Sequence, residues 1–276
     1  MNVTDIGSAM QLSTAEGWNQ TETDWKLFLQ SPGNICLVAE KDKKVAGTTT
    51  AINYSNQIAW IGMVLVAKDY RGQGISKSLL ANILEALKFV KTIKLDATAE
   101  GQRVYRQFDF KEEYIISRMV ATSVKNLAIV HDLSVQLIRS NDINEMIALD
   151  EVVFGANRAQ LIRSLVNEFP DKAYLLKKDT EATGFALGRI GIKYHHIGPV
   201  VAKNMHDAKR LIAKALRDLD NQPVVVDVPA DKQDMIRWLN TIGFAGQRDF
   251  VRMFRKDNLL PGIRSRQYSI CGPEFG

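Results

Sequence analysis

The sequence has little cysteine, no long apolar run and no region with a strong excess of one charge. Its two cysteines, Cys36 and Cys271, lie too far apart in sequence to suggest a disulfide framework or a metal site. Cys36 sits in an apolar, strand-like run and is expected to be a small core residue. We therefore expect neither a disulfide scaffold nor a metal cofactor.

Membrane and secretion signals are also missing. No apolar run approaches the roughly 20 residues that a membrane-spanning helix needs. Residues 1–5 lack the basic and then apolar pattern of a signal peptide. We expect a cytoplasmic protein with no membrane partner.

Charge is spread evenly along the chain. There are 15 basic and 13 acidic residues through Lys125, and 21 and 18 after it. Because no basic tail or stripe appears, nucleic acid is not an expected partner, and the pI of about 9.1 fits a polyanionic cofactor equally well. At 276 residues, with 46% apolar content, the chain is long enough for two globular domains.

What the sequence does contain is a glycine-rich turn between an apolar strand and an amphipathic helix, in residues 64–87. Gly72 and Gly74 allow close approach of the backbone, and the first N–H groups of the following helix lack partners within it. Such a junction favours a pyrophosphate, and Arg71 adds a positive charge. The spacing differs from that of the Walker loop and of the dinucleotide fingerprint, which argues against both classes.

This junction resembles the pyrophosphate loop of the GNAT superfamily of acetyl-CoA-dependent N-acetyltransferases, written R/Q-x-x-G-x-G/A. Ser76 stands where the family usually has Gly or Ala. A plain strand-to-helix turn with glycines for tight packing is the alternative interpretation. The resemblance implies an acetyl-CoA site made by the backbone of Val64, Leu65 and Val66 along the pantetheine arm, and by Arg71, Gly72, Gln73, Gly74, Ile75 and Ser76 at the pyrophosphate.

A second stretch resembles the other GNAT signature, in which N-x-x-A-x-x-x-Y-x-x-x-G-F follows a strand. Tyr105 falls on the tyrosine, whereas Thr98 replaces the usual Asn, Gly101 the usual Ala and Asp109 the usual Gly. The resemblance implies that Thr98 binds the cofactor. It also implies that Tyr105 is the general acid that stabilises or protonates the departing thiolate. Alternatively, Tyr105 is an amphipathic aromatic residue whose hydroxyl finds a structural partner.

The chain then repeats itself. Phe110 is followed eight residues later by Arg118, and Phe244 eight residues later by Arg252. Residues 66–69 recur as residues 201–204, at an offset of 135. We therefore predict an α/β fold of tandem GNAT domains with mixed sheets. The predicted N-terminal domain is 1–124, the linker 125–134 and the C-terminal domain 135–276.

The second copy lacks the expected chemistry. No glycine follows its strand near Asn204, and Leu239 stands where the first copy has Tyr105. The pair resembles bacterial two-domain GNAT proteins with an active N-terminal and a degenerate C-terminal domain, a match that includes the closing residues 272–276. The second copy is expected to complete the acceptor cleft or to form a dimer surface, so a homo-oligomer is left open.

Residues on the acceptor side are less defined. The first helices of the GNAT fold wall the acceptor cleft, so Trp18 is either a substrate contact or a core residue. Glu40, His195 and His196 are candidates for the general base, and a chain of water molecules is the alternative.

Two functions follow from these patterns. The first is an enzyme that moves an acetyl group from acetyl-CoA to a primary amine of a small molecule or peptide by direct attack. The second is a non-catalytic regulator that binds acyl-CoA. Retention of both the loop and Tyr105 favours the enzyme, because a binder needs no phenol.

Overall fold

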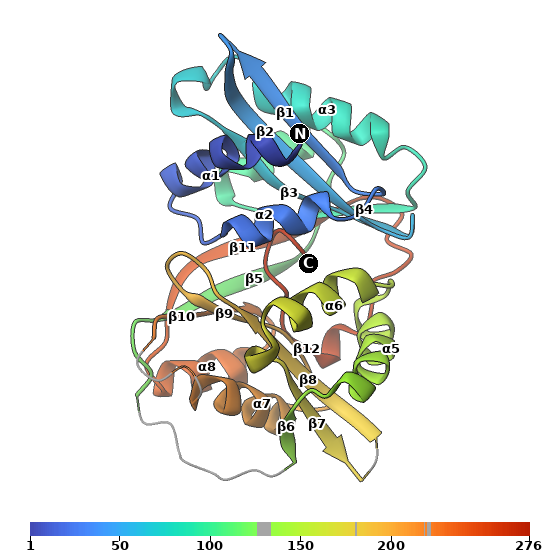
Figure 1. Ribbon diagram of the computed structural model, residues 1–276, viewed down its shortest axis with the longest axis vertical. Helices are drawn as coiled ribbons and strands as arrows, with labels where there is room; N and C mark the ends of the chain where they lie inside the picture. The colour runs from blue at the N-terminus through green and yellow to red at the C-terminus, as the bar shows by residue number, and fades with distance from the viewer. Residues whose placement is uncertain (126–133, 180, 218, 220–221) are drawn as a thin grey trace.

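Both halves of the chain repeat one order of elements: two helices, three antiparallel strands, then helix, strand, helix and strand (Figure 1). The computed structural model describes residues 1–125, 134–179, 181–217, 219 and 222–276. The first half contains α1 Ile6–Ala15, α2 Glu22–Leu29, β1 Ile35–Lys41, β2 Lys44–Tyr54, β3 Ile58–Val66, α3 Ile75–Ala86, β4 Thr92–Ala97, α4 Ala99–Arg106 and β5 Lys111–Ala121.

The second half begins with a short extra strand and ends with another. It contains β6 Val135–Leu137, α5 Ile143–Phe154, α6 Ala159–Glu168, β7 Tyr174–Lys178, β8 Glu181–Arg189, β9 His195–Val201, α7 Met205–Arg217, β10 Val224–Pro229, α8 Gln233–Thr241, β11 Ala245–Lys256 and β12 Gln267–Ser269. Short 3-10 turns occur at Val3–Asp5, Lys68–Tyr70, Ser140–Asp142, Pro170–Lys172 and Arg264–Arg266. None of the helices described is long and apolar enough to cross a membrane.

Local sequence signals explain most of these boundaries. Helix α2 begins after Thr21, whose hydroxyl accepts a hydrogen bond from the Asp24 N–H, while the Asp24 carboxylate accepts one from the Thr21 N–H at 2.7 Å. Helix α4 begins at Ala99 because Thr98 caps it, with the Thr98 hydroxyl accepting a hydrogen bond from the Gly101 N–H.

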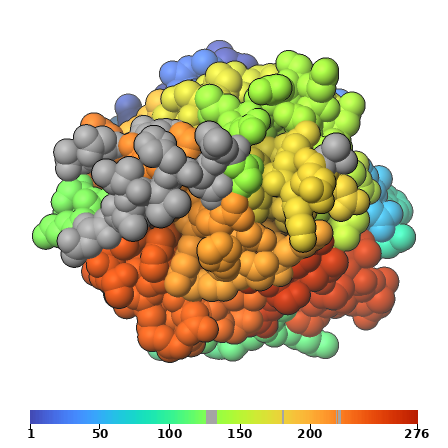
Figure 2. Space-filling model, turned by 90° about the horizontal axis from the view of Figure 1, so that it is seen from below, coloured from blue at the N-terminus to red at the C-terminus, as the bar shows by residue number. Residues whose placement is uncertain are grey.

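The two halves share one sheet because they exchange their last strands. Among the described residues, twelve strands form this sheet, and β11 of the second half lies between β4 and β5 of the first. In return, β5 of the first half pairs with β10 of the second. Val251 of β11 thus faces Ala97 of β4, and Met119 of β5 faces Val226 of β10. Figure 1 shows β5 and β11 crossing the middle of the molecule between the two halves. In Figure 2, viewed from the end of the second half, first-half segments in blue and cyan appear only at the edges.

Strands β3 and β4 diverge after a short parallel pairing. The paired segments are residues 58–60 of β3 and residues 92–94 of β4. A bulge follows in β3, where Thr50 faces Gly62 and Thr48 faces Leu65, and Met63 adopts a φ of 51°. No described strand pairs with the β4-facing edge of β3 beyond Trp60, which leaves a gap between the two strands.

Strands β9 and β10 of the second half diverge in the same way. Their parallel pairing ends at His196 and Val225, and a bulge at Gly198 and Pro199 repeats the β3 bulge at the offset of 135. Here β12 fills the gap: it pairs with β9, and the Ile270 N–H donates to the Asp227 carbonyl at 3.0 Å. The gap that is open in the first half is therefore closed in the second by the chain itself.

The chain then returns to the first half. The Trp60 indole N–H donates to the Pro273 carbonyl at 2.9 Å, and the Tyr54 hydroxyl to the Phe275 carbonyl at 2.7 Å. Phe275 also stacks on Phe28, with ring centroids 5.1 Å apart. Of the predicted linker, residues 126–133 lie outside the described residues, and the domain limits at 124 and 135 stay predictions.

Candidate active site

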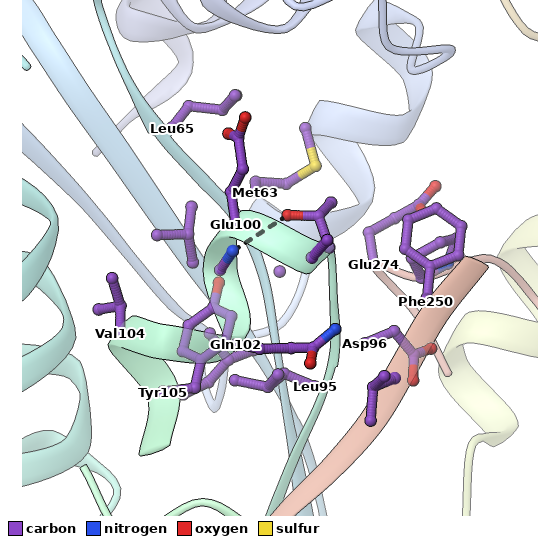
Figure 3. A pocket seen from close by; sticks show the side chains of 18 of the residues that line it. Met63, Leu65, Leu95, Asp96, Glu100, Gln102, Val104, Tyr105, Phe250 and Glu274 are labelled. Atoms are coloured by element: carbon purple, nitrogen blue, oxygen red, sulfur yellow. Dashed lines mark hydrogen bonds between the residues drawn. The ribbon is translucent and has the colours of Figure 1, made fainter. Parts of the chain in front are cut away.

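A cavity of about 890 Å³ occupies the gap between β3 and β4. Its walls come from the bulged end of β3, from β4 and α4, from β11 of the second half, and from the last residues of the chain. Figure 3 shows Tyr105 and Val104 of α4 on one side of this cavity and Phe250 and Glu274 on the other. Both halves of the chain therefore build one site.

The glycine-rich turn closes one end of this site. It runs from Ala67 to Gly74, and both Gly72 and Gly74 are left-handed, with φ of 75° and 80°. Residues that carry a side chain rarely adopt this backbone conformation, which explains why both positions are glycine. Gly74 also stands at the N-cap of α3 without a side chain to cap it, so the first N–H groups of α3 are available to a ligand.

The corresponding turn of the second half is built differently. Only residues 202–204 separate β9 from α7, and the Asn204 side chain accepts a hydrogen bond from the Asp207 N–H at 2.9 Å. A capped helix start and a short turn leave less room for a phosphate than the turn in the first half does.

Of the residues predicted to bind the cofactor, one group lines the cavity and another forms the turn beside it. The lining group is Val64, Leu65, Val66, Arg71, Ser76 and Thr98. The turn group is Gly72, Gln73, Gly74 and Ile75. The Arg71 guanidinium donates to Glu16 Oε1 at 2.5 Å, so an anion that binds Arg71 competes with this carboxylate.

Tyr105 lines the cavity from α4. Its ring packs edge-on against Phe110 at a centroid distance of 5.9 Å and lies over Gly101, where a Cβ atom would stand 2.8 Å from the tyrosine Cε2 atom. The ring can occupy this position because Gly101 has no Cβ atom. Burial raises the pKa of Tyr105 to about 12, so its hydroxyl keeps its proton at neutral pH.

Sequence reasoning missed the residues that the second half contributes. Phe250 and Arg248 of β11 and Glu274 near the chain's last residue all line the cavity. The closing residues 272–276 matched the two-domain pattern, but nothing in their local sequence points to a cavity in the other half. Trp18, predicted as either a substrate contact or a core residue, lines the cavity and packs against the core.

The three candidates for the general base do not line the cavity. Glu40 is exposed on β1. His196 is buried with Nε2 at 3.3 Å from Asp227, and burial lowers its pKa. His195 is half-buried beside it. None of the three belongs to this site as the structure describes it.

Comparison with known proteins agrees with this architecture. Two family patterns described as acetyltransferase (GNAT) domain match the chain, one at residues 146–269 and the other at residues 32–112. Holothin acyltransferase of Pseudoalteromonas sp. (strain SANK 73390) is 24% identical over 242 residues, which cover 87% of this chain and 81% of that protein.

Two solved structures share the fold. A candidate acetyltransferase from Pyrococcus horikoshii superposes with a TM-score of 0.84 at 22% identity, covering 100% of this chain and 94% of that one. A tandem GNAT protein from the clavulanic acid biosynthesis pathway superposes with a TM-score of 0.64 at 13% identity, covering 92% and 96%. The arrangement of two such domains in one chain is therefore a known one.

Proposed function

Because the chain belongs to the GNAT family of acyltransferases and carries two GNAT domains in tandem, we propose that its first half transfers an acetyl group from acetyl-CoA to a primary amine. The amine belongs to a small molecule or a peptide. The observation that supports this most is the contrast between the two halves. The gap between parallel strands is an open cavity in the first half, whereas β12 fills it in the second.

The residues of the first half fit acetyl-CoA. The free edge of β3 offers backbone N–H and C=O groups to the amides of the pantetheine arm, as to an added strand. The uncapped start of α3 and its glycine turn suit the pyrophosphate. Arg71 then exchanges Glu16 for a phosphate oxygen, to which its guanidinium donates a charge-assisted hydrogen bond.

The transfer proceeds by direct attack of the amine nitrogen on the thioester carbonyl carbon. The N–C bond forms, the C–S bond breaks and the sulfur leaves with the electron pair. Tyr105 gives its proton to this sulfur and then regains one from water, which also carries away the proton that the amine loses. Backbone N–H groups at the β3 bulge stabilise the negative charge on the carbonyl oxygen in between.

Calorimetric titration with acetyl-CoA tests this proposal. We expect one binding site per chain. The double variant Arg71→Glu, Gly74→Glu should abolish binding, since it places two negative charges at the phosphate turn. The matched control is Lys203→Glu, His206→Glu, which puts the same charges on two exposed residues at the corresponding turn of the second half and should leave binding unchanged.

Other outcomes would contradict the proposal. Two sites per chain, or loss of binding in the control only, would show that the second half holds acetyl-CoA. Binding at one site without transfer to any amine would favour a non-catalytic regulator.

A further inference from the structure

Glu274 is a buried carboxylate with one unused oxygen at the cavity. Its side chain is 3% exposed, and Oε1 accepts a hydrogen bond from Arg189 Nη2 at 2.5 Å. By hydrogen-bond geometry Oε2 has no partner among the described residues, although the Gln20 side chain lies close enough to the carboxylate to help lower its pKa. A buried charged oxygen without a partner costs free energy, which a donor from a ligand would recover.

The position of Glu274 is fixed by its neighbours. The Phe275 and Gly276 N–H groups both donate to the Gly272 carbonyl, at 3.0 and 2.9 Å, which closes residues 272–276 into a tight turn. Gly62 of β3 lies directly beneath, since a Cβ atom there would stand 3.0 Å from Glu274 Cα. The backbone and Cβ atom of Glu274 therefore pack against the bulged end of β3, the strand that is expected to bind the pantetheine arm and the thioester.

Arg189 keeps Glu274 ionised. Burial alone would raise the pKa of Glu274, but the Arg189 guanidinium, together with a smaller contribution from the Gln20 side chain, outweighs burial and holds this pKa below its usual value. Arg189 also pairs with buried Asp24, so one cation serves two carboxylates. Because Asp24 and Glu274 share this single guanidinium, the three side chains together carry a net negative charge that favours a second cation.

Arg248 is the complementary group at the same cavity. Its guanidinium lies 5.4 Å from the centre of the Phe250 ring, and its buried Nε atom has no hydrogen-bond partner among the described residues. Neighbouring Arg118 differs, because Asp227 binds it through two hydrogen bonds of 2.7 Å. Of these two arginines at the cavity, only Arg248 has no carboxylate partner in the described chain.

We propose that the acceptor is an amine that also carries an anionic group such as a carboxylate. Glu274 Oε2 accepts hydrogen bonds from the amine, and Arg248 binds the anion. This inference rests on the proposed acetyl transfer and narrows its substrate class. A site built to bond a polar group discriminates strongly against analogues that lack it, because its own buried groups are then unpaired.

The test uses acetyl-CoA and a panel of primary amines, each paired with its carboxylated counterpart, such as phenethylamine with phenylalanine. Release of free thiol measures turnover. For the pairs that react, we expect the carboxylated amine to be preferred at least about tenfold in kcat/KM by the wild type. Arg248→Gln should remove this preference. Glu274→Gln should raise KM for both members of a pair about tenfold or more.

Controls separate this inference from the proposed function. Both variants should bind acetyl-CoA with wild-type affinity, which also reports correct folding, and Glu85→Gln removes the same charge from the exposed surface of α3 as a control. Transfer without preference for the carboxylated amine, or an unchanged KM in Glu274→Gln, would overturn the inference alone. Absence of transfer to every amine would overturn the proposed function and the inference with it.

Discussion

Arg252 of the second half binds Asp96 of the first through two hydrogen bonds, of 2.8 and 2.9 Å. The same relationship recurs with the halves reversed, because Arg118 of the first half binds Asp227 of the second at 2.7 Å. Each arginine stands on an exchanged strand, and each aspartate on the strand that receives it. Two equivalent ion pairs thus join the halves where the strands cross.

Removing one partner of such a pair should be costly. Asp96→Ala leaves the buried guanidinium of Arg252 without its carboxylate, and we expect the free energy of unfolding to fall by about 3–5 kcal/mol. The double variant Asp96→Ala, Arg252→Met should recover much of this loss, because it buries no unpaired charge. Urea unfolding followed by circular dichroism measures both. Equal stability of the single and double variants would contradict this account.

Loss of the Tyr105 hydroxyl should affect turnover and not binding. We expect Tyr105→Phe to lower kcat about 100-fold, the usual scale of a general acid, with the calorimetric affinity for acetyl-CoA unchanged. Tyr268→Phe removes a hydroxyl from β12 in the second half and serves as the control. Wild-type turnover in Tyr105→Phe would remove this residue from the mechanism.

The raised pKa of Tyr105 predicts the alkaline side of the pH profile. An acid acts in its protonated form, and a pKa of about 12, above the ordinary value for tyrosine of about 10, preserves that form to higher pH. We expect no loss of kcat from Tyr105 between about pH 7 and 10. Steady-state kinetics at saturating substrates measure this. A loss near pH 9 that is present in the wild type and missing in Tyr105→Phe would show a lower pKa.

The variant Gly101→Ala should displace the ring of Tyr105 without destabilising helix α4. Gly101→Ala adds a Cβ atom 2.8 Å from the tyrosine ring, so the ring must move. Alanine favours a helix interior by up to about 1 kcal/mol over glycine, so the variant should unfold no more easily than the wild type. We expect kcat to fall several-fold while thermal stability is kept. Unchanged kcat would show that the ring position observed here is not needed for transfer.

The elements of the first half were predictable because their signals are local. The strand that leads into the glycine-rich turn follows from its apolar run, and the structure confirms it as β3. The helix from Ile75 follows from the spacing of its apolar residues, which face the sheet. Even the repeat was visible in the sequence. Phe110 and Phe244 directly precede β5 and β11, and Arg118 and Arg252 stand eight residues further along, on these two strands.

The shared sheet and the composite cavity were not predictable in this way. Periodicity shows which face of a strand is buried but not which strand lies beside it, so the place of β11 between β4 and β5 left no local trace. Glu274 reaches the cavity only because residues 272–276 return across the molecule to Trp60 and Gly62. Residue types and their spacing thus define the elements, the repeat and the glycine turn. Long-range pairing of strands assembles the site, because contacts between residues more than 150 positions apart depend on the folded chain as a whole.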